Sequence, residues 1–279
     1  MDLTILALPV FALLMLAEAI ITAVRGQEAY EWRDFGASMS QLAMNIVIRF
    51  GFNALLIGLH FYLYQHRFFE LGHGPLQWLL TLLVLDFMFY WYHRASHRIR
   101  FLWCAHVVHH SSERMNFGTA LRQSPTGPLT RALFYWPLPL LGFDPLVIAS
   151  AGAIATIYGF WTHTEMVKKL WAPVEYLFVT PSHHRAHHGS NPEYIDKNYA
   201  NMLIIWDRLF GTFVEEKAAV QYGLINNIGT YNPLRIAFNE WVKLFVSSVR
   251  ADSMVSALML WLHPPGWRQD KPIMKEALK

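Results

Sequence analysis

The sequence predicts an all-α integral membrane protein with about four membrane-embedded helical segments and a cytoplasmic helical lobe that carries a histidine cluster. Two observations predict this class. Of the 279 residues, 54% are hydrophobic and only 15% are charged, whereas soluble proteins average about 25% charged residues. The chain also contains several apolar stretches of about 20 residues, the length that a helix needs to cross the hydrocarbon core. A soluble helical core would explain neither feature.

The first three predicted membrane helices cover residues 3–24, 42–64 and 76–92. Each run contains a charged residue: Glu18 in the first, Arg49 in the second and Asp86 in the third. A charge at the membrane centre costs about 3 kcal/mol or more unless it faces protein or water. We therefore expect these side chains to lie inside the bundle, with an ion pair between Arg49 and Asp86 as the simplest structural explanation.

The fourth apolar stretch, residues 132–161, is interrupted near its middle by Pro137, Pro139, Gly142 and Pro145. Proline inside a helix removes a hydrogen bond and clashes with the preceding turn. This stretch is therefore predicted to form a re-entrant hairpin or two broken half-helices, the last of the four membrane-embedded segments.

The loop before this stretch is strongly basic. Six arginines and one acidic residue lie between residues 94 and 131, which predicts a cytoplasmic loop by the positive-inside rule. From residue 168 onward the composition is that of a membrane-associated lobe, which ends in an amphipathic segment at about residues 233–262 whose tryptophans suit an interface.

No repeat or linker divides the chain. Residues 1–279 are therefore predicted to be a single domain with a histidine-rich core at about residues 86–213. The net charge of +3 gives no overall basic field, and we expect no nucleic-acid partner. The single cysteine, Cys104, excludes an internal disulfide and is expected to be a packing residue.

Ten of the 14 histidines lie between His93 and His188, and eight of them follow three regular spacings. HRASH has two histidines four residues apart, whereas HVVHH and HRAHH each have histidines at i, i+3 and i+4. On a helix those offsets place the side chains on one face. The eight residues are His93, His97, His106, His109, His110, His184, His187 and His188.

This pattern predicts a metal centre. Packed together without a metal, so many imidazoles would leave buried nitrogens unsatisfied. A zinc ion usually takes four ligands, so two metal ions that share eight to ten nitrogens are the simplest stoichiometry. His163, in WTHTE, is a predicted ninth ligand, and His183 is a weaker candidate because it lies about 100° around the helix from His184. Imidazole suits zinc, copper, iron or nickel, so the ligand type leaves the metal open.

Polar residues close in sequence to these histidines are candidates for the hydrogen bonds that orient imidazole ligands. They are Asn116, Arg122, Gln123, Glu165, Asp196, Lys197 and Asn198. The chain has no HExxH motif and no GxSxG elbow. A dinuclear site at the membrane surface suits oxidation of a lipid chain, because the tail lies in the bilayer and oxygen is activated away from bulk water.

The order and spacing of HRASH, HVVHH and HRAHH resemble the fatty acid hydroxylase and sterol desaturase superfamily of membrane di-iron enzymes, over about residues 86–213. Two longer stretches, HHSSERMNFGTALRQSP and HRAHHGSNPEYIDKNYANMLIIWDRLFGTF, resemble its alkylglycerol monooxygenase branch. The resemblance implies two iron ions held by the eight histidines and His163, with molecular oxygen as co-substrate. It also implies an external reductant, either tetrahydropterin or a donor protein of the cytochrome or ferredoxin type.

These expectations describe a multi-pass membrane oxidoreductase that hydroxylates or desaturates a C–H bond of a lipid: an ether lipid, a sterol or a fatty acyl chain. Two alternatives stay open. A histidine-rich metal transporter would place its ligands near the bilayer midplane between repeated helices, and the sequence shows no repeat. A zinc-dependent lipid hydrolase would turn over without oxygen.

Overall fold

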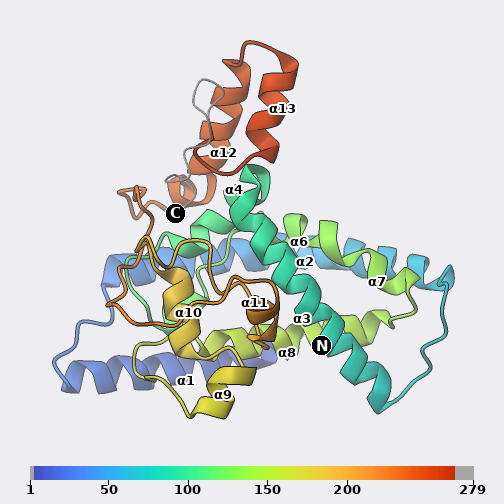
Figure 1. Ribbon diagram of the computed structural model, residues 1–279, viewed down its shortest axis with the longest axis horizontal. Coiled ribbons are helices and arrows are strands. Elements are labelled where there is room, and N and C mark those ends of the chain that lie inside the picture. The colour runs from blue at the N-terminus through green and yellow to red at the C-terminus, as the bar shows by residue number, and fades with distance from the viewer. Residues whose placement is uncertain (1–2, 268–279) are drawn as a thin grey trace.

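The computed structural model describes residues 3–267 and is built from α-helices joined by loops (Figure 1). Within that range no β-sheet forms, and a single isolated bridge pairs Gly189 with Tyr222. The predicted all-α class is therefore confirmed for the described part, whereas residues 1–2 and 268–279 of the predicted domain lie outside it.

Five helices are long: α1 (Leu3–Val24), α2 (Trp32–Gln65), α3 (Pro75–Arg98), α8 (Pro145–Trp161) and α12 (Pro233–Val249). The shorter ones are α4 (Arg100–His110), α5 (Phe117–Ala120), α6 (Gly127–Tyr135), α7 (Pro137–Leu140), α9 (Ala172–Leu177), α10 (Pro181–His188), α11 (Ile205–Leu209) and α13 (Met254–Leu262).

Several helices begin at a proline, whose fixed φ suits the first turn and whose missing N–H has no helical partner to lose there. The preceding residue often caps the helix. The Asp144 carboxylate accepts the first free N–H groups of α8, and the Asn232 side chain does the same for α12.

Two helices, α1 and α2, are long and apolar enough to cross a membrane. They contain the first two predicted membrane helices, although α2 begins ten residues before the predicted start at residue 42. The third predicted segment lies within α3, but this helix also carries buried polar side chains. They include Gln77, Thr81 and Asp86, which face protein.

The fourth apolar stretch is broken where the sequence predicted. α6 ends at Tyr135, α7 is a single turn, and the chain reverses before α8 begins (Figure 1). Gly142 makes this reversal: its φ is 92°, and a Cβ added there would lie 2.2 Å from the carbonyl oxygen of Phe69. Only glycine fits both the backbone angle and the contact.

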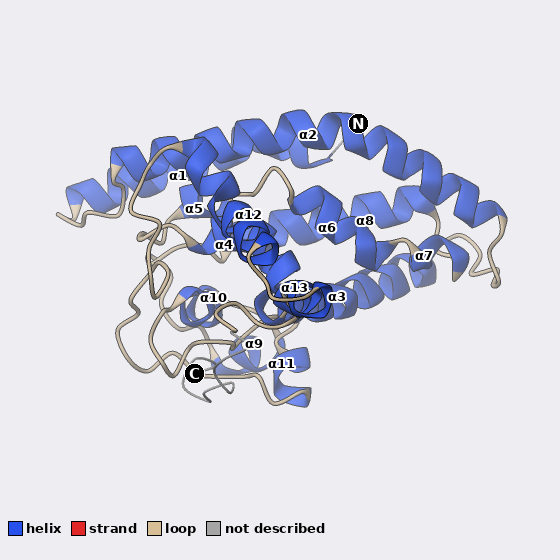
Figure 2. Ribbon diagram, turned by 90° about the horizontal axis from the view of Figure 1, so that it is seen from above, coloured by secondary structure: helices blue, strands red, loops and turns tan. Residues whose placement is uncertain are grey.

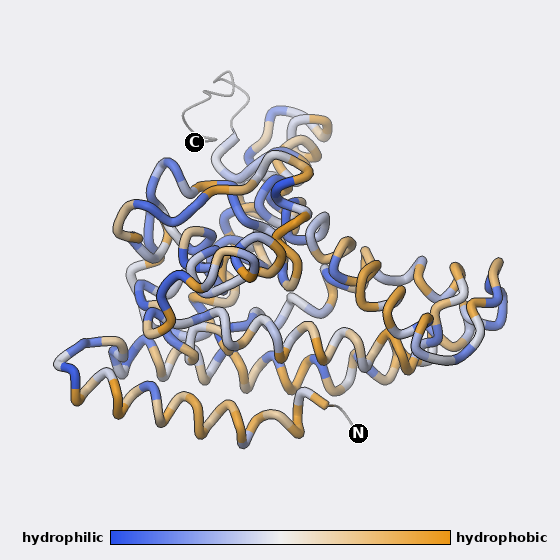
Figure 3. The backbone as a smooth tube through the Cα atoms, turned by 60° about the horizontal axis from the view of Figure 1, so that its bottom comes forward, coloured by the Kyte–Doolittle hydropathy of each residue, from blue (hydrophilic) through white to orange (hydrophobic). Residues whose placement is uncertain are grey.

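The helices form layers (Figure 2). α1 and α2 lie along one side, α3 and the short helices α9 to α11 lie on the other, and α8 packs between α1 and α3. The ring of Phe160 on α8 stacks on that of Phe11 on α1, with centroids 3.9 Å apart. Hydrophobic residues dominate α1 and most of α2, whereas hydrophilic residues gather in the loops around α10 (Figure 3).

Glu18 lies inside the bundle, as expected, with 1% of its surface exposed. Its carboxylate accepts hydrogen bonds from the Tyr30 hydroxyl at 2.6 Å, the Phe117 N–H at 2.7 Å and the Thr164 hydroxyl. These donors come from three separate segments, so one carboxylate on α1 joins the helix to the loops around α5 and α8. Burial of the charge is offset by these three donors.

Asp86 is also buried, but the predicted ion pair with Arg49 is wrong. The carboxylate accepts hydrogen bonds from the Met202 N–H at 2.9 Å, the Leu203 N–H at 3.0 Å and the Trp206 indole at 2.9 Å. Backbone donors from a loop distant in sequence thus take the place of a second charge. Asp86 therefore holds residues 202–206 against α3 by hydrogen bonds.

The basic loop has fewer free charges than its sequence suggests. Three of its six arginines form ion pairs: Arg98 with Asp196, Arg100 with Glu240 and Arg122 with Asp34. The charge excess that predicts a cytoplasmic loop therefore depends on the other three.

Candidate metal centre

Nine histidines form two neighbouring groups, and within each group the ligand nitrogens lie within 4.8 Å of one another. The five-histidine group comes from α3, α4 and α10. The four-histidine group comes from α4, α10 and the residue two positions after α8. The members of the first are His93, His97, His106, His110 and His187, and those of the second are His109, His163, His184 and His188.

Each HxxHH motif contributes to both groups. Its first and last histidines, at i and i+4, belong to one group, and the histidine at i+3 belongs to the other. Residues four apart on a helix differ by about 40° in direction, whereas residues at i+3 and i+4 differ by about 100°. The expectation of one shared face therefore holds for the i, i+4 pairs and must be corrected for the third histidine, which turns toward the adjacent group.

The Nε2 atoms converge within each group. Nε2 of His106 lies 2.8 Å from Nε2 of His93 and 3.0 Å from Nε2 of His110. In the other group, Nε2 of His163 lies 2.8 Å from Nε2 of His184. Two nitrogens at right angles around one ion, each at a bond length of about 2.1 Å, are about 3 Å apart. The spacing is that of ligands around a common ion.

Three of the rings are oriented by backbone carbonyls, which only accept hydrogen bonds. The proton must then sit on Nδ1, and the lone pair on Nε2 faces the group. This is the arrangement that a metal ligand needs, and the sequence could not indicate it because main-chain atoms supply it. The Nδ1 to carbonyl oxygen distances are 2.6 Å for His93 to Tyr199, 2.7 Å for His163 to Gly159 and 2.8 Å for His187 to Lys197.

Burial keeps these imidazoles uncharged. It lowers the pKa of His163 to about 3 and that of His187 to about 4. The pKa values of His184 and His188 also lie well below 6.5. Burial is the main cause, and repulsion by the neighbouring imidazoles is the second. At neutral pH the rings do not repel one another as cations, and their lone pairs are available to a metal ion.

His97 provides a test of whether a metal ion fits. Its Nε2 is buried and has no hydrogen-bond partner among the described residues. Its Nδ1 lies 3.8 Å from the carboxylate of Asp196, which also accepts a hydrogen bond from Arg98 at 2.6 Å. A buried nitrogen without a partner is costly, and a metal ion in the five-histidine group would satisfy it. All nine donors are imidazoles, so the set fits a transition-metal ion.

A polar stripe on α3 holds the loop that orients these rings. Asp86, Tyr90, His93 and His97 recur at helical spacing, and all four face residues 196–212. The Tyr90 hydroxyl, for example, lies 2.9 Å from Oγ1 of Thr212. Because His93, His97 and the residues that anchor the loop share one face of one helix, the loop and the histidine groups keep a fixed relationship.

Asp207 stabilises the same loop from within. Its carboxylate accepts hydrogen bonds from the N–H groups of Tyr199 and Ala200, both at 2.8 Å, and from the Thr212 hydroxyl at 2.7 Å. The Tyr199 peptide is thus held on both sides, by Asp207 at its N–H and by His93 at its carbonyl.

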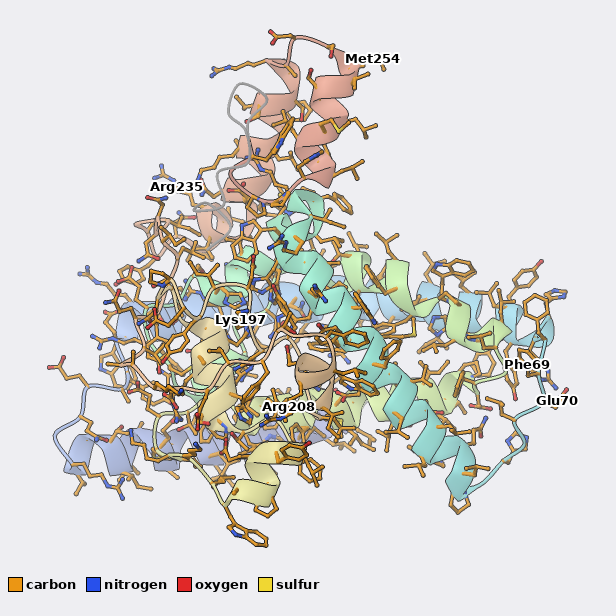
Figure 4. The ribbon with its side chains drawn as sticks, viewed as in Figure 1. Phe69, Glu70, Lys197, Arg208, Arg235 and Met254 are labelled. Carbon is orange, nitrogen blue, oxygen red and sulfur yellow. The ribbon has the colours of Figure 1, made fainter. Side chains whose placement is uncertain are left out.

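A left-handed turn presents the Lys197 carbonyl. Asp196 and Asn198, on either side of Lys197, have φ values of 60° and 52°, which non-glycine residues adopt only rarely. The Asn198 side chain donates to the carbonyl oxygens of His183 and Val214 and thereby holds this conformation. Lys197 lies between α10 and α3 (Figure 4), and its carbonyl is 2.8 Å from Nδ1 of His187.

His183 lies in neither group. Its Nε2 is 3.1 Å from the Glu175 carboxylate, and its Nδ1 accepts the Thr180 N–H at 3.3 Å. Both nitrogens therefore have partners, and the ring caps the start of α10. His183, the weaker of the predicted ligands, therefore has structural partners, although it lies on the same helix as His184, His187 and His188.

The predicted orienting side chains have other roles. The Arg122 side chain donates to the Val108 carbonyl at 3.2 Å and to Asp34 at 2.9 Å, so it fixes the end of α4. Asp196 comes nearest to a ring, at the 3.8 Å from His97 given above. The others bond elsewhere: Asn116 caps α5, Gln123 donates to Ala120, Glu165 accepts from Tyr222 and Asn198 bridges loop carbonyls.

The fold and the site together define a class of protein: helical, with two helices able to span a membrane, and with two adjacent sets of imidazoles suited to metal ions. Residues 78–212 match the family model described as Fatty acid hydroxylase. The matched residues include all three histidine motifs, whose spacing resembles that of this family.

Similarity to individual proteins extends further along the chain. It is 37% identical over 264 residues to the alkylglycerol monooxygenase of Xenopus tropicalis and 39% identical over 269 residues to that of Danio rerio, covering 94% and 95% of this chain. It spans only 59% and 60% of their length. It is also 34% identical over 146 residues to the ornithine lipid hydroxylase OlsE of Rhizobium tropici, and the matched region covers 50% of this chain and 44% of that protein. No solved structure matches.

Proposed function

We propose that this chain is a membrane di-iron oxygenase that uses O2 to hydroxylate an aliphatic C–H bond of a membrane lipid. The observation that supports it best is the pair of buried histidine groups, with uncharged rings whose Nε2 atoms converge. Relatives over most of the chain are named alkylglycerol monooxygenases. We therefore favour an ether lipid over a sterol or fatty acyl substrate, and hydroxylation over desaturation.

In this proposal, the five-histidine group holds one iron ion and the four-histidine group holds the other. When bound, the iron ions would supply the activation of O2 and the removal of hydrogen from the lipid carbon. The chain itself has three tasks. It offers lone pairs on Nε2, it fixes the rings through the carbonyls of residues 159, 197 and 199, and it keeps bulk water from the site by burial.

The proposed arrangement in the membrane follows from the apolar helices. α1, α2, α3 and the broken unit of α6 to α8 would be the four membrane-embedded segments, and the histidine groups would lie on the cytoplasmic side. An external reductant, either tetrahydropterin or a donor protein of the cytochrome or ferredoxin type, would reach the site from that side. The arginines of residues 94–131 that are not ion-paired support this orientation.

The test is oxygen incorporation by purified protein. The full chain would be loaded with ferrous iron and reconstituted in vesicles that contain either an alkyl ether lipid or its ester analogue, then given 18O2 with tetrahydropterin or with reduced ferredoxin. We expect about two iron ions per chain and one 18O atom in the ether-lipid product. In His109→Ala we expect loss of the product and of the iron ion of the four-histidine group.

His183→Gln is the matched control, because it changes a buried histidine on α10 that lies outside both groups. It should keep iron and activity. Turnover without O2 by a zinc-loaded protein would instead indicate a lipid hydrolase. Metal flux into sealed vesicles without lipid oxidation would indicate a transporter.

A further inference from the structure

The hairpin of α12 and α13 projects from the body (Figure 1). Exposed apolar side chains form a stripe along α12. In Figure 4, Arg235 lies near its root and Met254 at its far tip. At 100° per residue, five of the six exposed large apolar side chains of α12 fall within an arc of about 80°, and Val246 lies about 40° beyond it. The five are Leu234, Phe238, Val242, Phe245 and Val249.

The opposite face of α12 is buried against the body. Ile236, Ala237 and Leu244 lie on that face, and Glu240 accepts a hydrogen bond from Arg100 at 3.0 Å. The apolar stripe is thus on the outer side of a helix whose inner side is already packed. α13 also exposes apolar side chains, among them Met254, Val255, Leu258 and Leu262. Exposed patches of this kind mark an interaction surface.

The root of the hairpin lies at a defined level of the bundle. Gln41 on α2 donates to the carbonyl of Pro233 at 2.7 Å, and Asn45, one turn later, donates to Ser124 at 2.7 Å. The indole of Trp241 donates to Thr126 in the same polar junction. The exposed apolar surface of α2 begins immediately after this junction.

That apolar surface has the length of a membrane core. Apart from Trp32 at its start, the exposed large hydrophobic residues of α2 run from Ile46 to Tyr62. At 1.5 Å per residue this stretch covers about 25 Å, close to the hydrocarbon thickness of about 30 Å. The hairpin therefore leaves the body beside the N-terminal end of this stretch of α2.

Charge favours a lipid surface over other occupants. Arg235, Lys243 and Arg250 lie between about 100° and 180° on the same helical wheel, beside the apolar stripe. Glu240, the acidic residue of α12, faces inward in its pair with Arg100. A helix with an outward apolar stripe and an adjoining basic flank is typical of a helix that lies in the plane of an anionic interface.

We propose that α12 and α13 form an in-plane membrane anchor, with the apolar stripe among the lipid chains and the basic flank at anionic headgroups. The anchor also sets the height of the histidine groups. The first residue of α4, Arg100, donates its N–H to His263 at 3.0 Å and its side chain to Glu240, and α4 carries three of the histidines. This surface is separate from the metal groups, so the proposal does not depend on the proposed reaction.

The experiment measures the depth of spin labels in the full chain. Single cysteines would be placed at Phe245 and Leu258 on the stripe, and at Lys243 on the basic flank as the matched control, since Cys104 is buried. The vesicles contain equal parts of phosphatidylcholine and phosphatidylglycerol. Labels at 245 and 258 should collide with O2, be protected from a water-soluble nickel chelate and lie roughly 5–10 Å below the phosphates. The label at 243 should show the reverse.

Several outcomes would overturn this proposal. Nickel access at all three positions would show that the stripe faces water. Spin–spin broadening at 245 and 258, with both relaxing agents excluded, would show a second copy of the chain on the stripe. In vesicles of phosphatidylcholine alone, protection from nickel at 245 should fall at least twofold, and unchanged protection would contradict the role of the basic flank.

Discussion

The Nε2 atoms of His163 and His184 lie 2.8 Å apart, although one residue follows α8 and the other belongs to α10. The Nδ1 of His163 is held by the Gly159 carbonyl at 2.7 Å, so its Nε2 offers a lone pair to the four-histidine group. This contact joins the broken apolar unit to the histidine-rich lobe. It also allows the two groups to be tested separately.

Replacement of His163 by alanine should release the metal ion of the four-histidine group and leave the other in place. Metal analysis should then find about one ion per chain in place of two, with a loss of lipid oxidation of about 100-fold or more. His183→Gln, also buried, should retain both ions. Complete loss of metal from His163→Ala would mean that the two groups do not bind independently.

Asp207→Asn tests the loop that holds His93. An amide cannot accept hydrogen bonds from two N–H groups and a hydroxyl as the carboxylate does. The free energy of unfolding should therefore fall by about 1–3 kcal/mol. Thermal unfolding in detergent, combined with metal titration, should show lower stability and weaker binding in the five-histidine group. Asp144→Asn, at the exposed cap of α8, should change stability without changing metal affinity.

The buried pair of Arg122 and Asp34 should show strong energetic coupling. Arg122→Met alone leaves a buried carboxylate without its partner and should cost about 3–5 kcal/mol, whereas the double variant with Asp34→Asn should recover part of that loss. The side chains are 2% and 10% exposed, so solvent screens little of this interaction. Chemical denaturation of the four proteins completes the cycle, and simple additivity would contradict it.

Cys104 should resist modification in the native protein. Its side chain is fully buried, and burial raises the pKa of the thiol to about 12. A maleimide at pH 8 should label it only after unfolding. Because the folded pKa lies above the unfolded value, the unfolded state binds fewer protons between about pH 9 and 12, and stability should fall with rising pH in that range. Cys104→Ala should reduce this slope, as measured by denaturation at each pH.

The sequence allowed the histidine pattern to be recognised but not its division into two groups. The i and i+4 spacing predicts neighbours on one helix, and the structure bears this out for His106 with His110 and for His184 with His188. The turn of the i+3 member toward a second group depends on how α3, α4 and α10 pack. That packing follows from long-range contacts, such as those of Asp86 with residues 202 and 203, which no local pattern contains.

The predicted charged partner of Asp86 was wrong because backbone atoms are among its actual partners. Asp86 was expected to pair with Arg49 and instead binds two N–H groups and an indole. Every residue except proline carries a backbone donor, so composition gives no signal for such a partner. The broken fourth segment, by contrast, was predictable because proline and glycine act through local sterics.

The carbonyls that orient His93, His163 and His187 belong to the main chain, so their presence does not depend on which side chains stand at positions 159, 197 and 199. An alanine scan of positions 197 and 199 would leave both acceptors in place. A one-residue insertion or deletion between positions 196 and 199 would move two of them at once. In this loop, evolution and protein engineering therefore have more freedom to substitute residues than to change the loop's length.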